Sequence, residues 1–80
     1  MAYNQNNVKK LEKTIEGMKA GENICINAVN LNAKGIELLR NYVKSGVLIP
    51  DREEVEMLYK DVEAVMRGDV VFPQMTYIRQ

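Results

Sequence analysis

The chain has 80 residues, with 11 Lys/Arg, 11 Asp/Glu, one cysteine and no histidine. A chain of this length supports one small domain, and the absence of histidine removes the commonest general base and the commonest zinc ligand. The zero net charge argues against a nucleic-acid binder, because Lys and Arg neutralise phosphates in such proteins.

Nothing in the residue pattern indicates secretion or a membrane. A single cysteine cannot form an internal disulfide, and we find neither a leader segment nor an apolar run long enough to span a bilayer. We therefore expect a cytoplasmic protein. We predict no enzyme activity, no catalytic residue, no metal site and no cofactor.

The N-terminal residues lead into a first helix. Residues 1–6 are polar apart from Tyr3 and have no periodicity, so we expect a flexible arm ahead of one domain at residues 7–80. Asn7 is a suitable N-cap, and apolar residues recur after it at helical spacing. These features predict an amphipathic helix over residues 8–20. Its apolar stripe consists of Val8, Leu11, Ile15 and Met18.

A short β-rich run follows the first helix. Residues 24–29 are bounded by turn residues and include β-branched side chains, which predicts a strand. One face of this strand is apolar, and the other is expected to be only half protected from water. The first face holds Ile24, Ile26 and Ala28, and the second holds Cys25, Asn27 and Val29.

Asn32 is the N-cap of the second predicted helix. Apolar residues again recur at helical spacing, and Gly46 stands where a left-handed residue ends such a helix. Residues 47–49 and the following Pro50 are too apolar for a surface loop. We expect them to pack beneath the neighbouring helices.

The third helix has the strongest signals. Asp51 and Glu54 have the spacing of a capping box, and further acidic residues in the first turn suit the positive end of the helix dipole. Gly68 ends the apolar periodicity. We therefore predict one helix over residues 52–67.

The C-terminal residues predict a second strand over residues 69–78. Pro73 cannot donate a ladder hydrogen bond, so this strand lies at an edge, is bulged, or pairs only from Gln74 onward. The fold class is α+β, with three helices and two short strands in the order α-β-α-α-β. We expect the two strands to pair in antiparallel fashion.

The functional hypothesis rests on the apolar and aromatic side chains near the two termini. Aromatic residues are enriched at protein interfaces, and the second strand combines them with aliphatic residues. We predict a non-catalytic protein-binding module of the inhibitor or adaptor type. We also expect it to self-associate as a homodimer or higher oligomer, by strand addition. The predicted interface residues are Val70, Phe72, Met75, Tyr77, Ile78 and Tyr3.

Two alternatives belong to other classes. An oligomer could sequester a small phosphate-bearing ligand, such as a nucleotide, with Lys34 or Arg40 beside the helix that begins at Asn32. Weak nucleic-acid binding through the first helix is disfavoured, because acidic residues stand among its lysines. Those lysines are Lys9, Lys10, Lys13 and Lys19.

Overall fold

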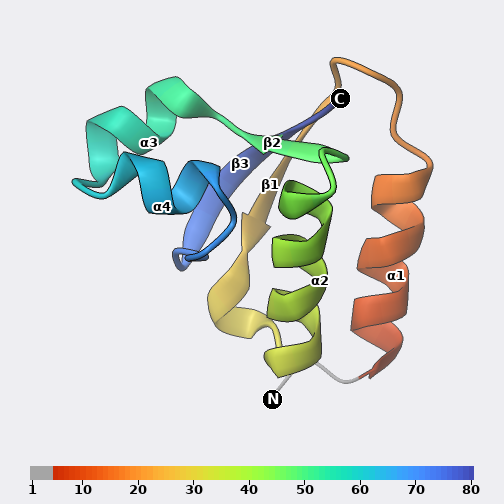
Figure 1. Cartoon of the computed structure of the whole chain (residues 1–80). Coiled ribbons are helices and arrows are strands. Elements are labelled where there is room, and N and C mark those ends of the chain that lie inside the picture. The colour runs from red at the N-terminus through yellow and green to blue at the C-terminus, as the bar shows by residue number, and fades with distance from the viewer. Residues whose placement is uncertain (1–4) are drawn as a thin grey trace.

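The computed structural model describes residues 5–80 and has an α+β architecture (Figure 1). This part of the chain contains four α-helices, one 3-10 turn and three strands. The elements are α1 (Gln5–Glu16), β1 (Asn23–Asn27), η1 (Ala28–Asn30), α2 (Ala33–Lys44), β2 (Leu48–Pro50), α3 (Arg52–Leu58), α4 (Val62–Met66) and β3 (Gln74–Arg79). The α+β class is thus as predicted, with one helix and one strand more than expected.

β3 is the central strand of the sheet, whose order is β1-β3-β2. β1 pairs with it from Asn23 opposite Ile78 to Asn27 opposite Gln74, and both neighbours of β3 are antiparallel to it. The expected antiparallel pairing is confirmed, and pairing begins directly after Pro73. Of the three alternatives for this strand, pairing only from Gln74 onward is confirmed. An edge position is excluded, because β2 occupies the side that β1 leaves free.

β2 is the strand that the sequence did not predict. Leu48 and Pro50 are buried, while Ile49 points the other way and is 36% exposed. Leu48 and Pro50 of the apolar run after the second helix are therefore buried as expected, but as part of the sheet, whereas Ile49 is not buried. The three residues of β2 pair with residues 77–79 of β3.

The predicted third helix is divided into α3 and α4. The side chain of Asp61 accepts a hydrogen bond from the N–H of Ala64 at 3.3 Å, so Asp61 is the N-cap of α4. Tyr59 is extended, and its hydroxyl donates to the carbonyl of Gln74 at 2.9 Å. A tertiary contact and a competing cap thus override the continuous helical periodicity.

The other helix ends follow local chemistry. Asn32 and Asp51 accept N–H groups as N-caps, as predicted, although the N–H of Asp51 bonds to Thr76 in β3 and leaves the capping box half formed. α1 begins three residues before the predicted range of 8–20 and ends four residues before the end of that range. Gln5 and Asn6, expected in the arm, and Asn7, expected as the N-cap, therefore belong to the helix. Gly17, a poor helix former, follows its last residue.

All four helices cover one face of the sheet. Each contributes a buried side chain to the same core as the inward-facing strand residues, and Figure 1 shows α1 beside α2 and α3 beside α4. Among residues 5–80, no helix has the length and apolar character needed to cross a bilayer. The buried core consists of Ile15, Ile26, Leu39, Leu48, Val55, Val65, Met75 and Tyr77.

Candidate functional site

The outer sheet face is the side of the sheet that the helices leave uncovered. Its residues alternate with the core residues along all three strands, as the register requires. Ile78 lies between Asn23 of β1 and Ile49 of β2. Thr76 lies opposite Cys25, and Gln74 lies opposite Asn27. The face consists of Asn23, Cys25, Asn27, Ile49, Gln74, Thr76 and Ile78.

This face combines polar and apolar side chains at intermediate to high exposure. Ile49 is exposed, whereas Thr76 and Ile78 at its centre are half-buried. Cys25 is an exposed free thiol, and the amide of Gln74 approaches its Sγ at 3.9 Å. The expectation that the Cys25 side of the first strand is only partly protected is confirmed.

The β1 edge is the outer side of the same sheet, and within residues 5–80 no strand pairs with it. Ala28 donates to the carbonyl of Pro73 at 2.6 Å, and Arg79 donates to the carbonyl of Glu22 at 2.8 Å. In an antiparallel ladder every second residue directs its N–H and C=O groups toward the partner strand, and these two bonds show which residues of β1 do so. Residues 24, 26 and 28 direct their backbone groups toward β3.

The intervening residues direct their backbone groups away from β3. Asn23 and Cys25 each present an N–H and a C=O along the β1 edge. Asn27 presents only its N–H. Its carbonyl is that of the N-cap residue of η1 and accepts the first hydrogen bond of that turn. The edge therefore offers alternating donors and acceptors for another strand.

The predicted interface residues of the C-terminal segment occupy three kinds of position. Met75 and Tyr77 are buried in the core, at 1% and 2% exposure, and their contact with a partner stays a prediction. Ile78 lies on the outer sheet face, and Val70 is 37% exposed in the loop before β3. Phe72 is half-buried in that loop. The remaining residue, Tyr3, lies outside the described residues.

Aromatic packing holds the loop before β3 against α3. The rings of Tyr59 and Phe72 stack with centroids 3.8 Å apart and planes at 6°. Deeper in the core, burial raises the pKa of Tyr77 to about 12, and its hydroxyl lies 3.8 Å from the sulfur of Met75. These contacts explain why aromatic residues of this segment serve the fold.

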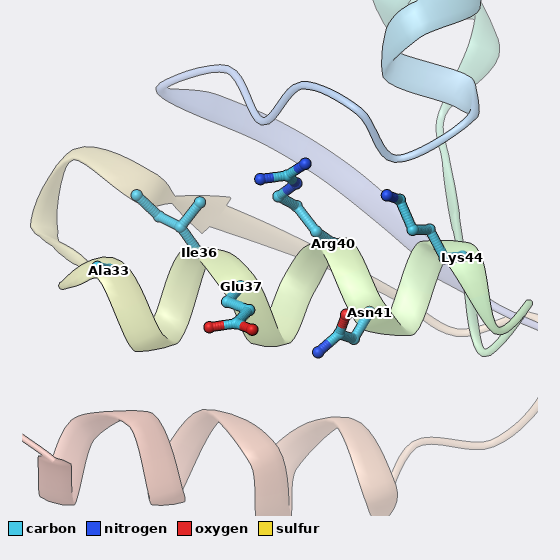
Figure 2. Close-up of a pocket in the computed structure, with 6 residues that line it drawn as sticks. All are labelled: Ala33, Ile36, Glu37, Arg40, Asn41 and Lys44. Carbon is cyan, nitrogen blue, oxygen red and sulfur yellow. The ribbon is translucent and has the colours of Figure 1, made fainter.

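A groove of about 480 Å³ runs along the outer side of α2 (Figure 2). Arg40 and Lys44 point to the same side of the helix, toward the loop before β3, whereas Glu37 and Asn41 point toward α1. The Nε of Arg40 donates to the carbonyl of Gly68 at 3.2 Å. The groove is lined by Ala33, Ile36, Glu37, Arg40, Asn41 and Lys44.

The predicted phosphate-binding residues do not converge on this groove. Asn32 directs its side-chain oxygen to the N–H of Gly35 at 2.9 Å, as the N-cap of α2. Lys34 is exposed and does not line the groove, so of the three predicted residues only Arg40 does. Lys44, which the prediction omitted, joins it, although Asp69 lies 3.8 Å from its Nζ.

The described residues give little support to nucleic-acid binding by α1 or to a metal site. The α1 lysines Lys9, Lys10 and Lys13 are exposed, but Glu12 and Glu16 are exposed beside them. The carboxylates therefore offset much of the positive charge that these lysines present. Among residues 5–80, no three His, Cys, Asp or Glu side chains gather as a metal site would require.

Comparison with known proteins places the chain in no family. No protein-family model matches it, and neither curated proteins nor solved structures give a significant match. Its function must therefore be argued from its own surfaces, of which the outer sheet face with the β1 edge is the most distinctive.

Proposed function

We propose that this protein is a non-catalytic protein-binding module that self-associates and acts as a small inhibitor or adaptor. The outer sheet face and the β1 edge form its contact surface. Strand addition at such an edge supplies main-chain hydrogen bonds, and side chains on the adjoining face supply selectivity. The strand that binds is therefore β1, in place of the C-terminal strand favoured by the sequence.

The observation that carries this proposal is the lack of protection along β1. Proteins usually guard an exposed strand edge with Lys, Pro, inward charges or a very short strand. β1 has five residues and none of them is charged or proline. β2, at the opposite edge, has three residues and ends in Pro50, which cannot donate a hydrogen bond.

Surface composition supports the same reading. Ile49 and Ile78 lie side by side on the outer sheet face, and Val29, directly beyond β1, is 70% exposed. Burying these groups in an interface releases about 25 cal/mol for each Å² of apolar surface removed from water. The chain's zero net charge leaves little long-range repulsion between copies.

Light scattering combined with size exclusion tests the proposal. We expect a mass above that of one chain, and a shift toward the monomer in Val29→Asp, because a carboxylate would replace the exposed apolar side chain directly beyond the β1 edge. Met57→Asp is the matched control, since Met57 is 79% exposed and belongs to α3, away from the sheet. A monomeric wild type at every concentration would overturn self-association.

A second candidate is anion binding in the α2 groove, favoured by the shared direction of Arg40 and Lys44 in Figure 2. It predicts a rise in melting temperature with nucleoside triphosphates. The rise should disappear in Lys44→Gln and persist in Lys34→Gln, because Lys34 lies on the same helix outside the groove. Unchanged melting across a nucleotide panel would exclude this candidate.

A further inference from the structure

β1 has a palindromic sequence. It reads Asn-Ile-Cys-Ile-Asn in both directions, with Cys25 at its centre. When such a strand pairs in antiparallel fashion with a second copy of itself, each residue meets its own type. Asn23 then faces Asn27 of the second copy, Ile24 faces Ile26, and Cys25 faces Cys25.

We infer that the β1 edge binds a second copy of this chain, with the two β1 strands antiparallel about a two-fold axis at Cys25. This inference rests on the proposed function and names its partner and register. The result is a continuous antiparallel sheet of six strands, because each subunit contributes its three. Such an isologous contact closes on itself and gives a dimer.

The backbone alternation is compatible with this register. Cys25 directs both its N–H and its C=O outward, so two opposed Cys25 residues exchange two hydrogen bonds. Asn23 and Asn27 also face outward, and the N–H of each Asn27 meets the carbonyl of Asn23 in the other copy. A register displaced by one residue would oppose outward-facing and inward-facing backbone groups, and would lose these bonds.

The side chains are compatible as well. The Oδ1 of Asn27 accepts from the N–H of Val29 at 3.2 Å, so it is the amide NH2 of Asn27 that can donate to the side-chain oxygen of Asn23 in the opposed copy. Ile24 lies opposite Ile26 of the other copy on the side of the helices, where Ile24 is half-buried and Ile26 already packs in the core, so this row brings no polar group into the contact. No charged residue of β1 opposes this pairing.

Self-recognition explains the palindrome, whereas a foreign strand would need no symmetry in β1. A different extended peptide would use the same backbone groups and would tolerate any residue order on β1. The two occupants are distinguished by whether residues of equal number meet at the centre of the interface.

Disulfide mapping with the full chain tests the register. In a hydrogen-bonded antiparallel pair the Cα atoms lie about 5.5 Å apart, within the range of roughly 4.4–6.8 Å found in disulfides, and a small shift of the two edge strands brings the Cβ atoms to the roughly 4 Å that the bond needs. We expect diamide, as the oxidant, to convert the wild type into a covalent dimer linked through Cys25. In Cys25→Ser carrying Asn23→Cys, the two thiols would lie roughly 14 Å apart, four residues along the strand, and should not link.

A combined variant gives the complementary result. Cys25→Ser with both Asn23→Cys and Asn27→Cys should form a dimer with two disulfides, each joining position 23 to position 27 of the other copy. Mass spectrometry of proteolytic fragments identifies the joined positions. Equal linking through Cys25 and through Asn23→Cys alone would indicate random collision and would overturn the register.

Charge substitution provides a test that does not depend on oxidation. Cys25→Lys places two like charges at the two-fold axis and should raise the dimer dissociation constant at least about tenfold. Met57→Lys is the matched control, because Met57 is 79% exposed on α3 and lies outside the contact surface. Circular dichroism confirms that both variants fold. Equal dissociation constants for the two variants would refute the inference.

Failure of the inference and failure of the proposed function give different results. A dimer that dissociates in Val29→Asp but forms no Cys25 link retains the proposed function and excludes the palindromic register. A wild type that remains monomeric and forms no link excludes both self-association and the register.

Discussion

Gly68 connects α4 to the C-terminal loop, and both its backbone conformation and its packing against α2 restrict which residue can stand there. Its φ is +82°, a region that L side chains enter at a cost of about 1–2 kcal/mol. It is also buried against α2. An added Cβ would lie 3.2 Å from the carbonyl oxygen of Arg40, and 3.1 and 3.2 Å from side-chain atoms of Lys44 and Val43.

Replacement of Gly68 by Ala should therefore combine a conformational cost with a packing cost. The carbonyl of Arg40 belongs to the α2 backbone and cannot move aside as a flexible side chain would. Overpacking of this kind costs about 1–3 kcal/mol. The total of about 2–5 kcal/mol is a large part of the roughly 4–12 kcal/mol expected for 80 residues.

Gly21→Ala is the matched control. Gly21 has a φ of +92°, but a Cβ there meets no atom within 4 Å, so it carries the conformational cost alone. Urea unfolding followed by circular dichroism measures both variants at one protein concentration. With a slope of about 1 kcal/mol per molar urea, the midpoint of Gly68→Ala should lie about 1–3 M below that of Gly21→Ala. Equal midpoints would refute the packing argument.

Three further predictions concern single side chains. Because burial favours the neutral phenol of Tyr77, its contribution to the free energy of unfolding should be constant below pH 10 and fall by about 1.4 kcal/mol per unit between pH 10 and the folded pKa of about 12. Tyr77→Phe should reduce that slope in urea unfolding at alkaline pH. Asn32→Ala should lower the free energy of unfolding by about 1 kcal/mol through loss of the α2 cap, whereas Asn41→Ala, exposed in the middle of that helix, should change it by only a few tenths. Asp61→Ala should accelerate hydrogen exchange of the Ala64 amide, and an unchanged rate would contradict its capping function.

Elements defined by neighbouring residues were predictable from the sequence. The caps at Asn32 and Asp51 and the left-handed glycines at Gly46 and Gly68 mark helix ends where the structure has them. In each case the residue type suits its position, because Asn and Asp accept a hydrogen bond from an unpaired helix N–H and Gly adopts a positive φ without strain. The antiparallel partner of the first strand was also recognised.

Elements created by distant contacts were not predictable in the same way. Leu48–Pro50 is a strand because β3 pairs with it, and three residues carry too little local signal to reveal that. The division of the third helix depends on Tyr59 reaching Gln74, and the cap at Asp61 is hidden inside a continuous apolar pattern. Local periodicity favours one helix, while the tertiary contact favours two.

The candidate site depends on sheet order, which sequence reasoning could not supply. Residues of β3 were predicted to bind a partner because they are apolar and aromatic, yet Met75 and Tyr77 are apolar because they are core residues. The free edge belongs to β1, whose palindrome around Cys25 is visible in the sequence. Its meaning emerges only once that strand is known to lie at the edge.

The central strand of the sheet is also the last of the three to be synthesised. β1 and β2 make no ladder with each other, so neither has a pairing partner until Gln74–Arg79 has left the ribosome. The nascent polypeptide must hold two unpaired β segments beside its helices, a state in which exposed strands invite aggregation. A ribosome stalled before the codon for Gln74 would therefore carry a chain that cannot complete its sheet.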